Sequence, residues 1–339
     1  MKQLSVLVLG LVLVGCSSAP QKSQPIVTKP VAPAVASEWV QTADVQAFIG
    51  QMVLRYGFKA DSLQALLNQA QLVPSLIQSM NHPSETRLVW YQYQALFIKP
   101  AVIQGGKKFM LQHEHVLHVA QERYGVPPGI IVGILGAETR YGQNEGSVSA
   151  LNALYTLAFA YPRRGAYFQN ELAQFLVLTR DAKLDPVAVK SSYAGALGMP
   201  QFMPSSYREY AVSSGPHYPD LFSDFSDVVL SVGHYFAEKG WQSGEPIAVQ
   251  VTMLHHQAKM SSLIGQTLTL RQFAQAGVVP LPSSQARYPH ALAAKLITLQ
   301  GKTAPEYWLL FHNFNVIKRY NASDLYAMTV FQLSELVAQ

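Results

Sequence analysis

The stretch PPGIIVGILGAETRYG, from Pro127 to Gly142, constrains the fold most, because it is a long apolar run with one acidic residue near its end. Apolar residues three and four positions apart predict a helix, and such steps from Ile130 and Ile131 both lead to Glu138. The proline pair suits the start of a helix, and Gly142 suits its end. We therefore expect a buried helix that carries Glu138 on its core-facing side.

The expected environment of Glu138 favours its protonated form. Burial disfavours the charged carboxylate, and so do the unpaired carbonyls in the last turn of a helix, so both effects raise the pKa. A carboxyl group with a raised pKa can donate a proton near neutral pH. Arg140 lies nearby in the sequence and would act in the opposite direction. The structural alternative is a buried glutamate that pairs with an arginine or accepts backbone hydrogen bonds.

Helical patterns dominate the chain to about Gly240. One runs from a cap-like Thr42 to Gly57, and similar patterns cover 59–71 and 108–125. Short β-rich runs such as PIAVQVTM and AAKLITLQG then appear among helical pieces such as TLRQFAQAG, before a last helix, SDLYAMTVFQLSELVAQ. The sequence thus predicts a mainly α fold with a small α+β insertion.

The N-terminus resembles a bacterial lipoprotein signal. Lys2 precedes an apolar stretch that is too short for a bilayer span, which needs about 20 residues, and Leu13-Val14-Gly15 precedes the only cysteine, Cys16. Lipidation of Cys16 would leave no thiol for a disulfide, a metal site or a nucleophile. The proline-rich segment that follows predicts a disordered tether with a reach of roughly 60 Å. A residue other than Asp after the cysteine, here Ser17, is typical of lipoproteins in the outer membrane.

A second segment, SSYAGALGMPQFMPSSY from Ser191 to Tyr207, combines small residues, glycines and prolines with polar groups. Such a loop allows the backbone to approach another group closely, and Ser192 and Gln201 flank its tight turn. It is typical of a wall of a binding site, although a well-packed loop between helices has the same composition. Pro204 can start the next helix.

Several other functions are disfavoured. The net charge is +5, but the basic residues form no stripe, so we expect no nucleic-acid partner. HEHVLH, from His113 to His118, lacks the second histidine that a zincin helix needs at the position of Leu117. The chain has no phosphate-binding Gly-Lys-Ser/Thr loop and no Gly-x-Ser-x-Gly elbow.

Five motifs in this order, ETRYG, YPRRGAYF, SYAGALGMPQFMPSSY, HYFAEKGW and RYNASDLYAM, resemble the membrane-bound lytic murein transglycosylase B family. The resemblance covers nearly all of the chain after the tether. It implies a lysozyme-like, mainly helical core, flanked by an N-terminal helical region and a small β-containing domain. It also implies cleavage of the β-1,4 bond between N-acetylmuramic acid and N-acetylglucosamine in peptidoglycan, without any cofactor.

The resemblance implies roles for individual residues. Glu138 is the catalytic acid and then the base, and a 1,6-anhydromuramoyl product forms without water. The implied substrate-binding residues are Ser192, Gln201, Tyr93, Tyr167, Tyr235, Asn321 and Arg163. Together with the N-terminal signal, we expect a monomeric outer-membrane lipoprotein, anchored through Cys16 and facing the periplasm. The expected divisions are a signal peptide over 1–15, a lipidated cysteine and tether over 16–37, a helical region over 38–120, a catalytic core over 121–243, an insertion over 244–311 and a closing segment over 312–339.

One loop departs from the family. Some members carry a calcium loop after a Tyr-Ala-Val segment, and calcium needs oxygen side chains at alternating positions. This chain has Ser213, Gly215, His217 and Pro219 at the matching places, with Asp227 at the end. We expect no calcium site and no other metal.

Two alternatives remain. A muramidase that uses water would need a second carboxylate, for which Glu145, Glu171 and Asp185 are candidates. A non-catalytic lipoprotein that binds murein would need none. Replacing Glu138 by glutamine separates them, because it should abolish cleavage but leave sugar binding intact.

Overall fold

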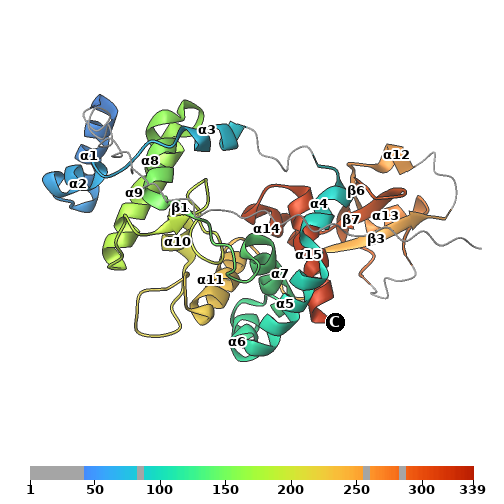
Figure 1. Cartoon of the computed structure of the whole chain (residues 1–339). Coiled ribbons are helices and arrows are strands. Elements are labelled where there is room, and N and C mark those ends of the chain that lie inside the picture. Colours follow the sequence, from blue (N-terminus) through green and yellow to red (C-terminus); the bar gives the residue numbers. More distant parts are fainter. Residues whose placement is uncertain (1–41, 82–87, 255–259, 282–287) are drawn as a thin grey trace, which may run out of the picture. The chain divides into compact units, whose positions relative to one another are not determined.

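The computed structural model describes residues 42–81, 88–254, 260–281 and 288–339, and most of them are helical (Figure 1). The expectations for 1–15, for Cys16 and for the whole tether lie outside these residues. The helices of at least eight residues are α1 (Ala43–Tyr56), α2 (Ala60–Leu67), α3 (Pro74–Asn81), α4 (Trp90–Phe97), α5 (Pro100–Gln112), α6 (Glu114–Tyr124), α7 (Pro128–Thr139), α8 (Ala150–Ala160), α9 (Gly165–Asp181), α11 (Phe225–Glu238), α14 (His312–Tyr320) and α15 (Asp324–Ala338).

The first helix has the boundaries that its sequence predicts. The Thr42 side chain accepts a hydrogen bond from the Val45 amide at the start of α1, and Gly57 ends the helix in the left-handed conformation. These two caps satisfy backbone groups that a helix terminus leaves unpaired.

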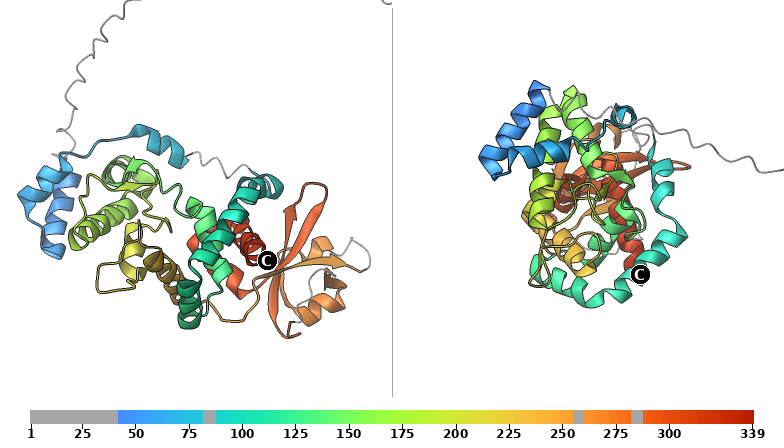
Figure 2. Two further views of the ribbon diagram at one scale, coloured as in Figure 1. Left: turned by 60° about the horizontal axis from the view of Figure 1, so that its bottom comes forward. Right: turned by 60° about the vertical axis from the view of Figure 1, so that its left-hand side comes forward.

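The apolar helix α7 contacts α5, α6, α11 and α15 (Figure 1 and Figure 2). Every residue from Gly129 to Gly136 is buried, as the apolar sequence predicts. Glycine lets α15 approach closely, because a Cβ atom on Gly133 would lie 2.8 Å from the carbonyl oxygen of Val330. The packing of α7 therefore depends on the absence of side chains at its glycines.

Two helix ends differ from the prediction. The pattern over 108–125 is not one helix, because the chain breaks at His113, where α5 ends and α6 begins. Helix α7 begins at Pro128 as expected but ends at Thr139, three residues before Gly142, because Arg140 takes the left-handed conformation with a φ of 51°. Glu138 therefore lies in the last turn, as expected, but the turn that follows is made by non-glycine residues.

The β-rich runs form a five-stranded antiparallel sheet in the order β4-β6-β7-β3-β5. Its strands and short helices are β3 (Ala248–Met253), α12 (Met260–Leu263), β4 (Thr267–Thr269), α13 (Leu270–Gln275), β5 (Val278–Pro280), β6 (Ala293–Gln300) and β7 (Pro305–Leu310). A cluster that includes Val251, Phe273 and Leu296 forms its own small core. Trp308 joins the main core and packs edge-to-face on Phe331 of α15.

Elsewhere the strands are minimal. The pair β1 (Val148–Ser149) and β2 (Lys190–Ser191) brings together the segment after α7 and the segment that leads to Ser192. The short helix α10 (Pro204–Tyr210) begins at the expected proline. Among the described residues no helix has both the length and the apolar character to cross a bilayer.

Candidate active site

Glu138 is half-buried at the end of α7 and accepts a hydrogen bond from a tyrosine of α15. The hydroxyl of Tyr326 lies 2.6 Å from Glu138 Oε1, and the Tyr326 side chain is almost fully buried. Burial, and then the negative charge of Glu138, raises the pKa of Tyr326 well above its usual value. Tyr326 therefore keeps its proton, and its hydroxyl donates a hydrogen bond to the carboxyl group of Glu138.

A second tyrosine of the closing segment, Tyr320, also lies near Glu138. Burial of its phenol, followed by the charge of Glu138, raises the pKa of Tyr320. Its hydroxyl donates to the carbonyl oxygen of Pro200, in the wall segment that follows Ser192. Tyr320 thus connects the end of α14 with the wall of the site, and it stays neutral at every physiological pH.

The turn after Glu138 is held in an unusual conformation. Arg140 and Tyr141 have positive φ values of 51° and 63°. The Tyr141 hydroxyl donates to the Val102 carbonyl over 2.9 Å, and its ring fills the space that a side chain on Gly106 would need. Thr139 is buried and donates to the Met199 carbonyl over 2.9 Å. The end of α7 is thereby fixed to α5 and to the wall segment.

Ser192 shapes this wall through its own hydroxyl. Its Oγ accepts hydrogen bonds from the amides of Ala194 and Ala196, at 3.3 and 3.1 Å. The glycines of this segment let the backbone approach other residues of the protein, rather than a ligand. A Cβ atom on Gly195 would lie 2.4 Å from Leu154, and one on Gly198 would lie 2.4 Å from Leu221. The hydroxyl proton of Ser192 is the group that remains to be offered to a ligand.

Gln201 connects the wall to the segment that follows α7. Its Nε2 donates to the carbonyl oxygens of Glu145 and Gly198, at 3.1 and 2.9 Å. Both amide hydrogens are therefore used within the protein, and Oε1 is the atom left to accept a hydrogen bond. Gln201 also has a positive φ of 52°, which the two bonds help to hold.

The three predicted tyrosines occupy different environments. Tyr93 is 2% exposed on α4, and its charge would further raise the pKa of Tyr326, so the two phenols are neighbours. Tyr235 is also buried, packs edge-to-face on Tyr320 and donates to the Arg319 carbonyl over 2.6 Å. Only Tyr167 is exposed, at 38%. The structure therefore gives Tyr235 a packing role and Tyr167 a face that a ligand can reach.

The other predicted residues lie at the surface. Asn321 is exposed, and its Oδ1 accepts a hydrogen bond from the Ser323 amide over 3.2 Å. Arg163 is exposed and lies 3.5 Å from Oδ1 of Asn81. Its neighbour Arg164, which the sequence did not single out, instead covers the ring of Tyr167 at 4.2 Å.

The three candidates for a second carboxylate differ sharply. Glu171 is buried and accepts hydrogen bonds from the amide and the hydroxyl of Ser205, at 2.9 and 2.7 Å, so it is structural. Asp185 accepts a hydrogen bond from the Val187 amide within its own loop. Glu145 is half-buried, and burial, with a contribution from Asp220, raises its pKa to about 7.

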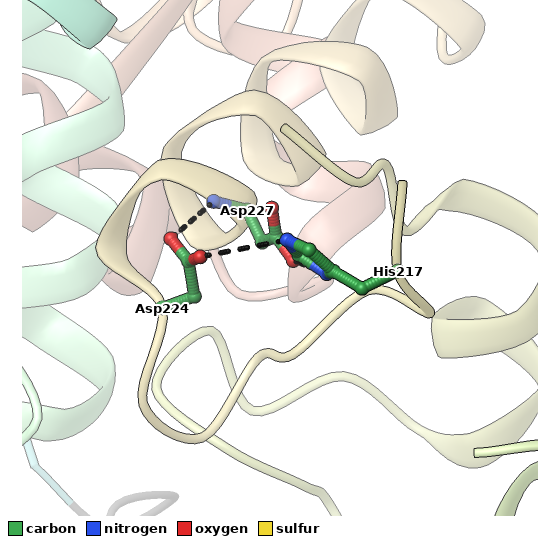
Figure 3. Close-up of side chains that lie close together, drawn as sticks. All are labelled: His217, Asp224 and Asp227. Atoms are coloured by element: carbon green, nitrogen blue, oxygen red, sulfur yellow. Dashed lines mark hydrogen bonds and ion pairs between the residues drawn. The ribbon is translucent and has the colours of Figure 1, made fainter. Parts of the chain in front are cut away.

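One group of side chains lies close enough to share an ion. In the part of the chain that the structure describes, His217, Asp224 and Asp227 each offer one ligand atom, and these atoms lie within 4.8 Å of one another (Figure 3). They belong to the loop that departs from the calcium pattern and to the start of α11.

Comparisons with known proteins agree on one family. The model of the transglycosylase SLT domain matches residues 41–335. The membrane-bound lytic murein transglycosylase B of Escherichia coli is 39% identical over 315 residues, which cover 90% of this chain and 85% of the relative. A structure of the lytic transglycosylase Slt35 of Escherichia coli in complex with calcium has a TM-score of 0.80 and 39% identity, covering 89% of this chain and 94% of the other.

A more distant structure adds a ligand. SltB3 of Pseudomonas aeruginosa, in complex with NAG-anhNAM-pentapeptide, has a TM-score of 0.75 and 27% identity over 86% of this chain and 78% of the other. The apolar α7 with its terminal glutamate, the Gly-rich wall and the closing helix thus occur in a chain that has the lysozyme-like fold of lytic transglycosylases. This chain belongs to the transglycosylase SLT domain family and is a lytic transglycosylase.

Proposed function

We propose that this enzyme cleaves the β-1,4 bond between N-acetylmuramic acid and N-acetylglucosamine in peptidoglycan, with Glu138 as the acid and then the base. The contact between Tyr326 and Glu138 is the observation that carries the proposal. The half-buried carboxyl group at the end of α7 has beside it a tyrosine hydroxyl that stays neutral and can donate to a carboxyl oxygen in either protonation state, which suits an acid that then becomes the base. The complex of SltB3 with an anhydro-muropeptide supports the product class.

The reaction balances with one carboxyl group. Glu138 donates its proton to the glycosidic oxygen as the bond to C1 of the muramoyl residue breaks, and the substrate's own acetamide oxygen stabilises the positive centre. The Glu138 carboxylate then takes the proton of the muramoyl 6-hydroxyl, whose oxygen bonds to C1 and closes the 1,6-anhydro ring. Tyr326 stabilises the carboxylate between the two steps. No water is consumed.

The remaining residues divide by accessibility. We assign Ser192, Tyr167, Asn321 and Arg163, which are exposed or half-exposed, to contacts with the glycan or its peptide. We assign a supporting role, without direct substrate contact, to Tyr93, Tyr235 and Gln201, because their rings or polar groups already contact other parts of the protein. An aromatic ring such as that of Tyr167 can pack on the apolar face of a sugar.

We also propose that Cys16 is lipidated and anchors a periplasmic, monomeric enzyme to the outer membrane. The name of the Escherichia coli relative, which is membrane-bound, supports this. Metabolic labelling with a radioactive fatty acid should mark the full chain, and Cys16→Ala should remove the label. Labelled Cys16→Ala protein would show that the anchor lies elsewhere.

The decisive experiment uses a soluble form that begins at Ser17, incubated with purified peptidoglycan. Mass spectrometry of the released muropeptides should show products lighter than hydrolysis products by one water. Glu138→Gln should abolish cleavage but retain binding, whereas Glu122→Gln, on the exposed surface of α6, should behave as the unchanged enzyme. Reducing-end products would mean that water attacks and that a second carboxylate such as Glu145 is needed, and binding without cleavage would indicate an anchoring protein.

A further inference from the structure

The loop between α10 and α11 does not fit the calcium ion that a relative of this enzyme binds. Calcium takes six to eight oxygen ligands, many of them carboxylates. Of the residues expected at the ligand positions, Gly215 and Pro219 have no side-chain oxygen, and the Ser213 hydroxyl is already bonded to the backbone of Gly215. The place of a ligand is taken by His217, whose nitrogens hard cations disfavour.

The ring of His217 lies among oxygen atoms instead (Figure 3). Its Nδ1 is 3.1 Å from Ser213 Oγ, 3.1 Å from the Tyr218 carbonyl oxygen and 3.5 Å from Asp227 Oδ2. Its Nε2 faces Asp224 Oδ2 at 3.9 Å. Both ring nitrogens therefore point toward groups that accept hydrogen bonds or carry negative charge.

Counting donors fixes the proton on Nδ1. The carbonyl of Tyr218 can only accept, and the Ser213 hydroxyl gives its proton to the Gly215 carbonyl over 2.7 Å. No neighbour thus supplies a hydrogen to Nδ1, so Nδ1 must itself be the donor. When Nε2 carries a proton as well, the ring is an imidazolium, and its positive charge faces the carboxylate of Asp224.

The buried aspartate of this group benefits from a positive neighbour. Asp227 is fully buried, and its two oxygens accept the amides of Ser214 and Asp220 at 2.6 and 2.8 Å. Asp224 caps α11 through Oδ1, which leaves Oδ2 directed at the ring of His217. A buried carboxylate is costly unless it is paired as well as hydrogen-bonded.

We propose that the imidazolium of His217 is the cation around which this loop is built, in place of a metal ion, and that His217 is a positioning residue for the active site. The role in cleavage rests on the proposed function of Glu138. The ring holds the loop to the first turn of α11, and the loop holds the wall of the site.

The charges that face the ring act together. The hydrogen bond to Tyr218 and the charges of Asp227, Asp224 and Asp220 raise the pKa of His217. His113, from the junction of α5 and α6, lines the same opening of about 700 Å³, and its own burial lowers its pKa, so it adds no competing charge.

A short chain of contacts connects this loop to Glu138. Tyr207 accepts the Leu221 amide over 2.9 Å, and the Leu221 carbonyl accepts the Met199 amide over 2.9 Å. The Met199 carbonyl in turn accepts the hydroxyl of Thr139, the residue after Glu138. Loosening the loop would therefore displace the wall relative to the catalytic carboxyl group, and positions matter there on the scale of 1 Å.

A transition metal is a poorer occupant. With Nδ1 protonated and each oxygen of Asp227 already accepting an amide, Nε2 of His217 and Oδ2 of Asp224, 3.9 Å apart, are the atoms of this group best able to bind a metal. Stable zinc sites use three or four protein ligands. Metal binding is therefore an outcome that the test must detect, and it would overturn the proposal.

The first experiment compares His217→Ala, His217→Gln and His217→Lys with the unchanged enzyme. The matched control is His115→Ala, on the exposed surface of α6. Muropeptide release is followed from pH 5 to pH 9. We expect Ala and Gln to lower kcat about three- to tenfold at pH 6 with little change in KM, because the substrate contacts remain. Lys keeps a cation and should restore most of the rate.

The pH dependence separates charge from shape. The contribution of the imidazolium is complete below about pH 6.5 and is lost as the pH rises through the raised pKa of His217. The rates of the unchanged enzyme and of His217→Gln should therefore converge at high pH, while His217→Lys should stay active there. A constant ratio at every pH, or no rescue by Lys, would refute the role of the charge.

A second measurement is independent of cleavage. In Glu138→Gln protein, nitrogen chemical shifts of His217 report its protonation directly, and they should show a pKa above the usual value of about 6.5. Prior treatment with EDTA should leave both the spectrum and the activity of the unchanged enzyme as they were. A normal pKa, a response of His217 to micromolar Zn²⁺, or activity that EDTA removes and Ca²⁺ restores would each contradict the proposal. Failure of Glu138 as the catalyst would leave this spectrum unaffected.

Discussion

Substitution of Glu145 gives the most direct test of the electrostatics beside the wall segment, Ser191 to Tyr207. Its side chain is half-buried, and burial, followed by the charge of Asp220, raises its pKa from 4.5 to about 7. The substitution Glu145→Gln keeps the shape and removes the charge. It also spares the contact to Gln201, which uses the backbone oxygen of residue 145 rather than its side chain.

The sign of the effect follows from proton linkage. Between pH 4.5 and about 7 the folded protein holds a proton on Glu145 that the unfolded chain has released, so the free energy of unfolding falls as the pH rises through this window. At about 1.4 kcal/mol for each pH unit, the full penalty above pH 7 would be about 3.4 kcal/mol. Because water reaches part of the side chain and screens its charge, we expect about 1–2 kcal/mol.

Urea denaturation at pH 4, 6 and 8 measures this penalty. Glu145→Gln should match the unchanged protein at pH 4 and exceed its free energy of unfolding by about 1–2 kcal/mol at pH 8. Glu122→Gln, at an exposed position, should show no such dependence. An equal gain at all three pH values would show that packing rather than charge is responsible, and a loss at pH 8 would refute the reasoning.

Two further substitutions test the site and its support. Tyr326→Phe removes the hydrogen-bond donor that lies 2.6 Å from Glu138 Oε1. It should lower kcat about tenfold to a hundredfold, since a hydrogen bond to a charged group contributes about 1.5–3 kcal/mol. An unchanged kcat in muropeptide release would mean that this contact does not stabilise the carboxylate. Gly133→Ala should lower the free energy of unfolding by about 1–3 kcal/mol, because its Cβ would lie 2.8 Å from a backbone oxygen. Gly50→Ala on α1, with nothing within 4 Å, should be neutral or stabilising. Urea denaturation measures both variants, and an equal effect of the two substitutions would contradict the packing argument.

The helical framework was predictable because its signals are local. Thr42 and Gly57 cap α1 as their residue types suggest, and Pro128 opens α7. The β-rich runs PIAVQVTM and AAKLITLQG contain the strands β3 and β6. Each of these inferences depends on residues within a few positions of one another.

The break at His113 was not predictable by the same means. The apolar periodicity continues through this position, but the ring of His113 packs against Phe109 and Phe225 at centroid distances of 4.4 and 4.5 Å. Phe225 comes from α11, more than a hundred residues away. A tertiary contact thus accompanies a helix boundary that local propensity does not mark.

The site shows the same limit more strongly. Its sharpest contact joins Glu138 to Tyr326, 188 residues later, and no spacing rule connects them. The closing motif drew attention to Asn321, whereas the structure directs Tyr326 of the same motif at Glu138. The residue type carried a signal nonetheless: a tyrosine at a buried position of a helix needs a partner for its hydroxyl, and a carboxylate is a strong one.

The turn after Glu138 is fixed by the groups packed around it. Of the four non-glycine residues with positive φ in the described chain, Arg140, Tyr141 and Gln201 flank the site. Each such conformation costs about 1–2 kcal/mol and persists only where its surroundings fix it. Here the fixing groups are identifiable: the ring of Tyr141 fills space that glycines of α5 and α7 leave empty, and Gln201 is held by two backbone oxygens. The glycines of α5 and α7 thus make room for the turn that ends the catalytic helix. The position of Glu138 is therefore set by the strain and packing of its neighbours rather than by the helix alone.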